Sequence, residues 1–251
     1  MFRPSPHVIG WSDVEVYARL GDPETENVET SDEKPAGPHA PAMLVEPIQN
    51  EYISHESLLQ ESAIISDFGQ SYIAASPPPS YQPGTILSYQ PPETRFEGRA
   101  GFEADIWMLG CAIFEIRAGF SLFESFIGSD IEVLKQMVET LGRLPDPWWD
   151  AFEQRALWFG KDGQPMSEQD QDRAGVHLEA HGTSIRMRLL EIGKQDDPPS
   201  KDEGAMIENS GVRLPEEEVD LLADLLQKML KYSPEERICI QDVIRHPWFT
   251  L

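Results

Sequence analysis

An ordered set of short motifs constrains the fold of this chain more than its composition does. In chain order, the motifs are Asp67-Phe68-Gly69, Pro91-Pro92-Glu93, Asp105-Ile106-Trp107-Met108-Leu109-Gly110, Arg237 and His246-Pro247-Trp248-Phe249. A tripeptide recurs by chance in many proteins, so none of these motifs decides a fold by itself. Their order and spacing together are far more specific, and they cover most of the chain.

The chain has 251 residues and a formal net charge of −24, from 44 acidic and 20 basic side chains. Such an acidic protein repels a phosphate backbone, so we expect no nucleic-acid partner. It favours basic protein partners instead, through electrostatic steering more than through affinity. The alternative is that the charge serves only solubility and loose acidic loops.

The cysteines and the apolar stretches bear on the compartment. Cys111 and Cys239 both have apolar neighbours and are predicted to be buried small hydrophobes, without a disulfide framework or zinc spacing. The longest apolar stretch, residues 107–116, is too short to span a bilayer and contains Glu115. The N-terminus has no signal-peptide core. We therefore expect no membrane partner and an intracellular protein, either cytoplasmic or nuclear.

Hydrophobic periodicity and capping residues predict a mainly helical chain. Ser12 and Glu15 form a capping-box pattern before a helix that Gly21 ends. The stretch from Ala104 to Arg117 is apolar almost all round, as in a buried helix. Helices are predicted over residues 12–20, 104–117, 131–141, 185–192, 214–230 and 240–244, and short strands over residues 43–45 and 63–65.

These motifs resemble the second half of a protein kinase domain, most closely that of SR-protein kinases and their fungal relatives. The subfamily resemblance rests on residues 67–71, 89–93 and 113–119. It implies a mainly α fold, a kinase-like large lobe with a few short strands near Asp-Phe-Gly and with the small lobe absent. The expected parts of this partial kinase domain (1–251) are an acidic insert-like segment (1–62), the metal motif with the activation segment (63–93) and a helical large lobe (94–251).

The resemblance assigns the cofactor motif to Asp67, Phe68 and Gly69. In the family, the Asp of this motif holds Mg²⁺ against the phosphates of ATP, and a carboxylate suits this hard cation. Asp67 is therefore the expected metal ligand, while Phe68 would pack beneath it and Gly69 would allow the backbone to turn. The alternative is an ordinary Asp-x-Gly turn at the end of a strand.

Three further residues receive structural roles from the resemblance. Glu93 would pair with Arg237 and so tether the activation segment to the distal helices. Asp105 would accept backbone hydrogen bonds from the catalytic loop. Without the resemblance, Glu93 and Arg237 would be two unrelated surface charges, and Asp105 would be a carboxylate at the positive end of a helix dipole.

Several parts of a working kinase are not found in this sequence. No G-x-G-x-x-G and no His-Arg-Asp stands before Asp67, and the first lysine, Lys34, lies in an acidic loop-like stretch. No residue is therefore assigned a catalytic role, and ATP and Mg²⁺ are cofactors of the intact family. Two functions remain open: part of a serine/threonine kinase that is inactive as this chain, or a catalytically dead kinase-like module that recruits basic, Arg/Ser-rich partners.

Overall fold

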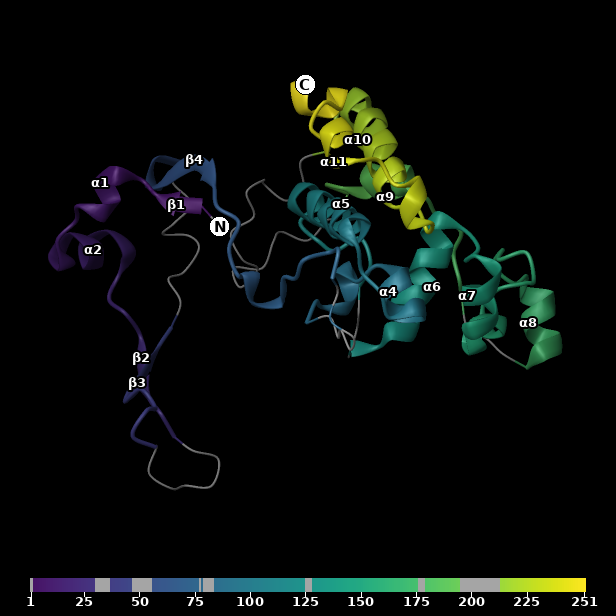
Figure 1. Ribbon diagram of the computed structural model, residues 1–251, viewed down its shortest axis with the longest axis horizontal. Coiled ribbons are helices and arrows are strands. Elements are labelled where there is room, and N and C mark those ends of the chain that lie inside the picture. The colour runs from purple at the N-terminus through teal and green to yellow at the C-terminus, as the bar shows by residue number, and fades with distance from the viewer. Residues whose placement is uncertain are drawn as a thin grey trace. The chain divides into compact units, whose positions relative to one another are not determined.

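The computed structural model describes residues 2–29, 37–46, 56–76, 78, 84–124, 128–175, 179–194 and 213–251. Contacts divide these residues into two compact units, the described residues up to Phe68 and those from Gly69 onward. All the described strands belong to the first unit, and the longer helices belong to the second (Figure 1). The prediction of a mainly α protein with a few short strands is confirmed.

Two small antiparallel ladders and two helices make up the first unit. Its elements are β1 (Phe2–Pro4), α1 (Pro6–Ile9), α2 (Asp13–Leu20), β2 (Thr25–Asn27), β3 (Met43–Val45), η1 (Glu56–Leu58) and β4 (Leu59–Ala63). β1 pairs with β4, and β2 pairs with β3. The predicted capping box of α2 is confirmed, since the Ser12 backbone N–H donates to Glu15 Oε2 at 2.9 Å.

One predicted strand is out of place. The sequence predicts a strand at residues 63–65, but β4 ends at Ala63. The reason is its pairing with β1, which places Phe2 opposite Ala63 and Pro4 opposite Leu59. The two β-branched residues that suggested the strand therefore lie beyond the ladder, and Ile65 is 82% exposed. Pairing with a distant segment overrode the local propensity.

Helices and 3₁₀ turns make up the second unit. These are η3 (Leu87–Tyr89), α4 (Pro92–Glu97), α5 (Phe102–Ala118), α6 (Asp130–Leu141), α7 (Asp146–Ala151), η5 (Glu153–Leu157), α8 (Glu168–Ala174), α9 (Ile185–Glu191), α10 (Glu216–Met229), η6 (Pro234–Glu236), α11 (Ile240–Val243) and η7 (Pro247–Thr250); η2 (Phe68–Gln70) joins the two units in sequence. The predicted helices at 104–117, 131–141, 185–192, 214–230 and 240–244 are thus confirmed to within a few residues.

The central element of the second unit is α5. It is apolar on nearly every side and buries Trp107, Cys111 and Phe114. Gly110 faces α10 so closely that an added Cβ would lie 3.2 Å from Leu230 Cδ2. α5 and α10 can therefore pack closely at this point, and a larger residue would force Leu230 to shift.

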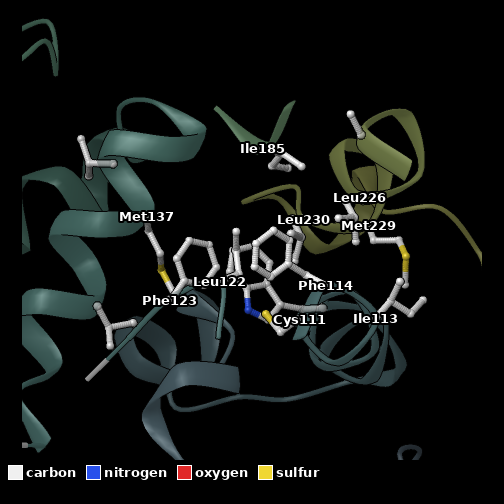
Figure 2. Packing of buried hydrophobic residues seen from close by; sticks show 14 of the residues in the cluster. Cys111, Ile113, Phe114, Leu122, Phe123, Met137, Ile185, Leu226, Met229 and Leu230 are labelled. Atoms are coloured by element: carbon white, nitrogen blue, oxygen red, sulfur yellow. The ribbon is translucent and has the colours of Figure 1, made fainter. Parts of the chain in front are cut away.

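Side chains from α5, α6, α9 and α10 meet in one core around α5 (Figure 2). α10 contributes a buried face that includes Leu222, Leu225 and Leu226, while Glu216 and Glu217 are exposed at the start of the helix. This pattern follows from its amphipathic sequence. Trp148 and Trp149 are also buried, so the aromatic-rich stretch after residue 145 packs into the core.

The prediction that both cysteines are buried is half wrong. Cys111 is 2% exposed within the core, but Cys239 is exposed. Cys239 is the N-cap residue of α11, outside the helix, and its Sγ lies 3.1 Å from Asp242 Oδ2. Its apolar neighbours misled the prediction because they are not fully buried themselves: Ile240 is 43% exposed, and Ile238 is only partly buried.

Candidate functional site

Glu93 and Arg237 form a buried ion pair. Glu93 lies in the first turn of α4, and Arg237 follows η6. Arg237 Nη1 donates to Glu93 Oε1 at 2.7 Å, and Nη2 donates to Oε2 at 2.6 Å. The two side chains are only 2% and 0% exposed, respectively. This bidentate geometry is the strongest form of a carboxylate–guanidinium contact.

The remaining donors of Arg237 also have partners. Nε donates to Lys231 O at 2.8 Å, and Nη1 donates to Glu103 O at 2.8 Å. The guanidinium also lies 5.0 Å from the centre of the Trp107 ring, which adds a cation–π contact. A buried charge is tolerated only when it is paired and hydrogen-bonded, and Arg237 meets both conditions. Arg237 thus links α4, α5 and the end of α10.

Asp105 lies in the first turn of α5, beside the segment that follows Asp-Phe-Gly. It lines a cavity of about 150 Å³ together with Gln70, Ser71, Tyr72 and Phe102, among others. Within the described part of the chain, no hydrogen bond or ion pair to its carboxylate is found. The carboxylate is still partly open to solvent, and the surrounding protein raises its pKa above the ordinary value through loss of hydration.

The predicted cofactor motif falls at the boundary between the two units. Asp67 and Phe68 belong to the first unit, and Gly69 belongs to the second. Asp67 has φ 63°, the left-handed region that residues other than glycine adopt rarely. Such a conformation costs energy and gathers at functional sites. Phe68 is 65% exposed in this structure. Its expected packing beneath Asp67 stays a prediction.

A second link between the residues just before Glu93 and α5 escaped the sequence analysis. The Tyr89 hydroxyl donates to Glu115 Oε2, and Ser121 Oγ donates to the same oxygen at 3.0 Å. Tyr89 ends the η3 turn just before Pro91-Pro92-Glu93. Burial, and then the hydrogen bond with Glu115, raise the pKa of Tyr89 well above its ordinary value. The sequence did offer a signal for this contact: Glu115 is an acidic residue within an apolar helix, and a buried charge needs a polar partner.

Two polar contacts hold α10, one to α5 and one to the end of the chain. Arg117 donates to both carboxylate oxygens of Glu218, at 2.6 and 2.9 Å. His246 Nε2 lies 2.9 Å from Asp224 Oδ2, while its Nδ1 accepts from the Trp248 N–H at 3.3 Å. The ring therefore donates through Nε2. These contacts account for the polar residues of the terminal His-Pro-Trp-Phe motif.

The described residues fit a metal ion only in part. No group of three or more His, Cys, Asp or Glu side chains is close enough to hold a metal within these ranges. Asp67 offers one carboxylate, and Mg²⁺ is commonly held by one or two carboxylates together with substrate phosphates. A larger cavity of about 670 Å³, lined by Arg143, Asp146, Lys231 and Glu236 among others, contains none of the predicted site residues.

The sequence profile described as "Protein kinase domain" matches residues 53–249. The chain belongs to the protein kinase family. This match includes Asp67-Phe68-Gly69, Glu93, Asp105 and Arg237, and the family works with ATP and Mg²⁺. No helix in the described part of this kinase-family chain is long and apolar enough to cross a membrane.

Curated relatives are protein kinases from three kingdoms. The chain is 25% identical over 169 residues to human "Dual specificity protein kinase CLK2", which covers 66% of this chain and 28% of that protein. It is 27% identical over 152 residues to "Serine/threonine-protein kinase prp4" of Schizosaccharomyces pombe (58% and 28%). It is 25% identical over 162 residues to "Serine/threonine-protein kinase AFC1" of Arabidopsis thaliana (64% and 30%). The chain thus spans less than a third of the length of these relatives.

Proposed function

We propose that this chain is part of a serine/threonine protein kinase and holds the activation-segment anchor of its large lobe. In an intact catalytic domain, this part would support transfer of phosphate from ATP to Ser or Thr of a protein. The Glu93–Arg237 ion pair carries the proposal, because it fixes the end of the activation segment to helices far along the chain. The relatives named as serine/threonine kinases support the same reaction class.

We propose further that the isolated chain transfers no phosphate. Positioning and charge stabilisation supply most of phosphoryl-transfer catalysis, and they depend on a Gly-rich loop, a strand Lys and a catalytic Asp. None of these motifs stands before Asp67 in this sequence. Loss of the base alone costs roughly 10²–10⁴ in rate. Asp67 would serve as a magnesium ligand only when the nucleotide and its other ligands are supplied.

The test uses radiolabelled ATP and an Arg/Ser-rich peptide as the acceptor. The purified chain and its Asp67→Ala variant should both show background incorporation. Transfer by the unmodified chain above that of Asp67→Ala would overturn the proposed inactivity. For the intact kinase, Asp67→Ala is introduced at the native gene, and the protein is immunoprecipitated with an antibody against residues 94–251. We expect this substitution to abolish the transfer measured in the precipitate, and unchanged transfer contradicts the kinase proposal.

A binding module is the second candidate, and the net charge of −24 favours it. In this reading the kinase-like fold recruits a basic, Arg/Ser-rich protein without acting on it. Thermal melting separates the two candidates, because a ligand specific to the folded state raises the midpoint. A rise with Mg²⁺-ATP supports nucleotide binding, whereas a rise with an Arg/Ser-rich peptide and none with Mg²⁺-ATP supports the binding module.

A further inference from the structure

The ladder of β2 and β3 is an incomplete sheet. It has two strands and no third among the described residues. Met43, Leu44 and Val45 of β3 are 54%, 55% and 62% exposed, so its apolar strand faces solvent. A two-stranded ladder is marginally stable in water, and an unpaired edge is a template for another strand. Both facts favour an added strand.

The hydrogen bonds of the ladder show which backbone groups are already used. The Glu46 N–H donates to Glu24 O at 2.9 Å, and the Val28 N–H donates to Ala42 O at 3.2 Å. In an antiparallel ladder, hydrogen-bonded pairs alternate with pairs whose backbone groups point outward. Glu24 with Glu46 and Val28 with Ala42 are therefore hydrogen-bonded pairs, and in the pairs next to them the backbone groups point away from the partner strand.

The outward pairs are Thr25 with Val45 and Asn27 with Met43. The N–H and C=O groups of Met43 and Val45 point toward the open edge of β3. Those of Thr25 and Asn27 point toward the opposite edge, that of β2. The β3 edge is the better template, since it combines free backbone groups with apolar side chains, whereas β2 carries only Thr, Glu and Asn.

The charges of the ladder indicate the chemistry of the added strand. Side chains alternate between faces, so Glu24, Glu26 and Glu46 share one face with Leu44. Glu24 and Glu46 are directly opposite each other, and like charges in that position destabilise a ladder. Hydrogen bonding with Glu24, and then its charge, raise the pKa of Glu46 above its ordinary value. The described residues 22–29 and 37–46 contain no Lys or Arg that could relieve the repulsion.

We propose that the open edge of β3 binds an extended basic segment of a partner protein as a third strand. Every second residue of that segment would be Arg or Lys and would lie on the face of Glu24 and Glu46. The residues between them would be apolar and would lie on the face of Met43 and Val45. This inference rests on the binding-module candidate, whose recruiting surface it names, and it requires no phosphoryl transfer.

The probe is a fluorescent octapeptide that alternates Arg and Val, added to the full 251-residue chain. A peptide of the same composition, with four Arg followed by four Val, is the matched control, because it has the same charge but no alternation. Fluorescence anisotropy measures both. We expect the alternating peptide to bind at least fivefold more tightly than the block peptide.

Two proline variants separate the two edges of the ladder. Val45→Pro removes an outward N–H from the β3 edge and leaves the ladder hydrogen bonds in place. Thr25→Pro removes the equivalent N–H from the β2 edge and is the matched control. We expect Val45→Pro to weaken binding about tenfold, and Thr25→Pro to change it less than twofold. Glu46→Gln should weaken binding about threefold and lower its salt dependence.

Four results would overturn the proposal. The first is equal binding of the peptide to the unmodified chain and to Val45→Pro, and the second is equal binding of the alternating and block peptides. The third is a dimer of the free chain that Val45→Pro disperses, since the occupant would then be a second copy. The fourth is slow hydrogen exchange at the Met43 and Val45 amides of the free monomer, since the chain itself would then cover the edge. None of these results bears on the ATP assays, so the two proposals fail separately.

Discussion

The Glu93 carboxylate accepts two hydrogen bonds from the Arg237 guanidinium, at 2.7 and 2.6 Å, across a sequence separation of 144 residues. Both side chains are shielded from water, and the arginine also binds the backbone of α5 and of the segment after α10. A pair of this kind is weak evidence for high stability, because desolvation offsets much of the attraction. Removal of one partner is a different matter, since it leaves the other charge buried and unpaired.

Glu93→Gln should therefore destabilise the second unit by about 3–5 kcal/mol. The measurement is urea unfolding followed by tryptophan fluorescence, since Trp107 lies against Arg237. Glu235→Gln is the control: its side chain is 70% exposed, and its ion pair with Arg99 is long, at 3.8 Å. The control should cost less than about 0.5 kcal/mol. A loss below about 1 kcal/mol for Glu93→Gln would contradict the proposed anchor of the activation segment.

Sequence patterns predicted the longer helices of the second unit because the arrangement of apolar residues can be read along each of them, whereas the short helices α4, α7 and α8 were not predicted. α6 and α10 show one apolar stripe, and α5 is apolar all round, so burial can be read from the sequence. The Glu93–Arg237 contact has no local signal, and only the family resemblance suggested it. The strand expected at 63–65 and the buried Cys239 were wrong because partners distant in sequence or cap geometry decided them.

The Arg117–Glu218 pair should make stability depend on pH in the acid range. Hydrogen bonding from Arg117, opposed by partial burial, lowers the pKa of Glu218 below its ordinary value of 4.5. A lowered pKa in the folded state means that the stabilisation is complete above the unfolded pKa and is lost as the pH falls through the folded value. Glu218→Gln should cost about 2 kcal/mol at pH 7, and the difference from the unmodified chain should shrink below pH 4.5.

Urea unfolding at several pH values between 7 and 3.5 measures this difference. Glu217→Gln is the matched control, because it lies in the same turn of α10 but is exposed and forms no ion pair found among the described residues. The control should show no pH-dependent difference. If the cost of Glu218→Gln were equal at pH 7 and at pH 3.5, the contact with Arg117 would not involve the charged carboxylate.

Tyr89 should make stability depend on pH in the alkaline range. Burial, and then Glu115, raise the pKa of its hydroxyl above the ordinary value of 10.0. Its contribution is therefore present below pH 10 and is lost as the pH rises above that value. Tyr89→Phe should cost about 1 kcal/mol at pH 7. Ultraviolet absorbance at 295 nm, followed as the pH is raised, checks the direction. The number of tyrosines that ionise only above their ordinary pKa should fall by one when Tyr89 is replaced.

Asp105 should behave in the opposite way to Glu218. Loss of hydration raises the pKa of its carboxyl, and no hydrogen bond or ion pair in the described part of the chain offsets this loss. A raised pKa in the folded state means that the charged carboxylate lowers the free energy of unfolding at pH 7. This loss of stability disappears as the pH falls and the carboxylate is protonated. Asp105→Asn should therefore leave stability at pH 7 unchanged or raise it by less than about 1 kcal/mol, because the site is partly exposed. Urea unfolding at pH 7 and pH 4.5 measures the stability of Asp105→Asn relative to the unmodified chain. Any gain in stability from the substitution should be smaller at the lower pH. A loss of more than about 1 kcal/mol at pH 7 would instead show that the Asp105 carboxylate accepts hydrogen bonds within this chain.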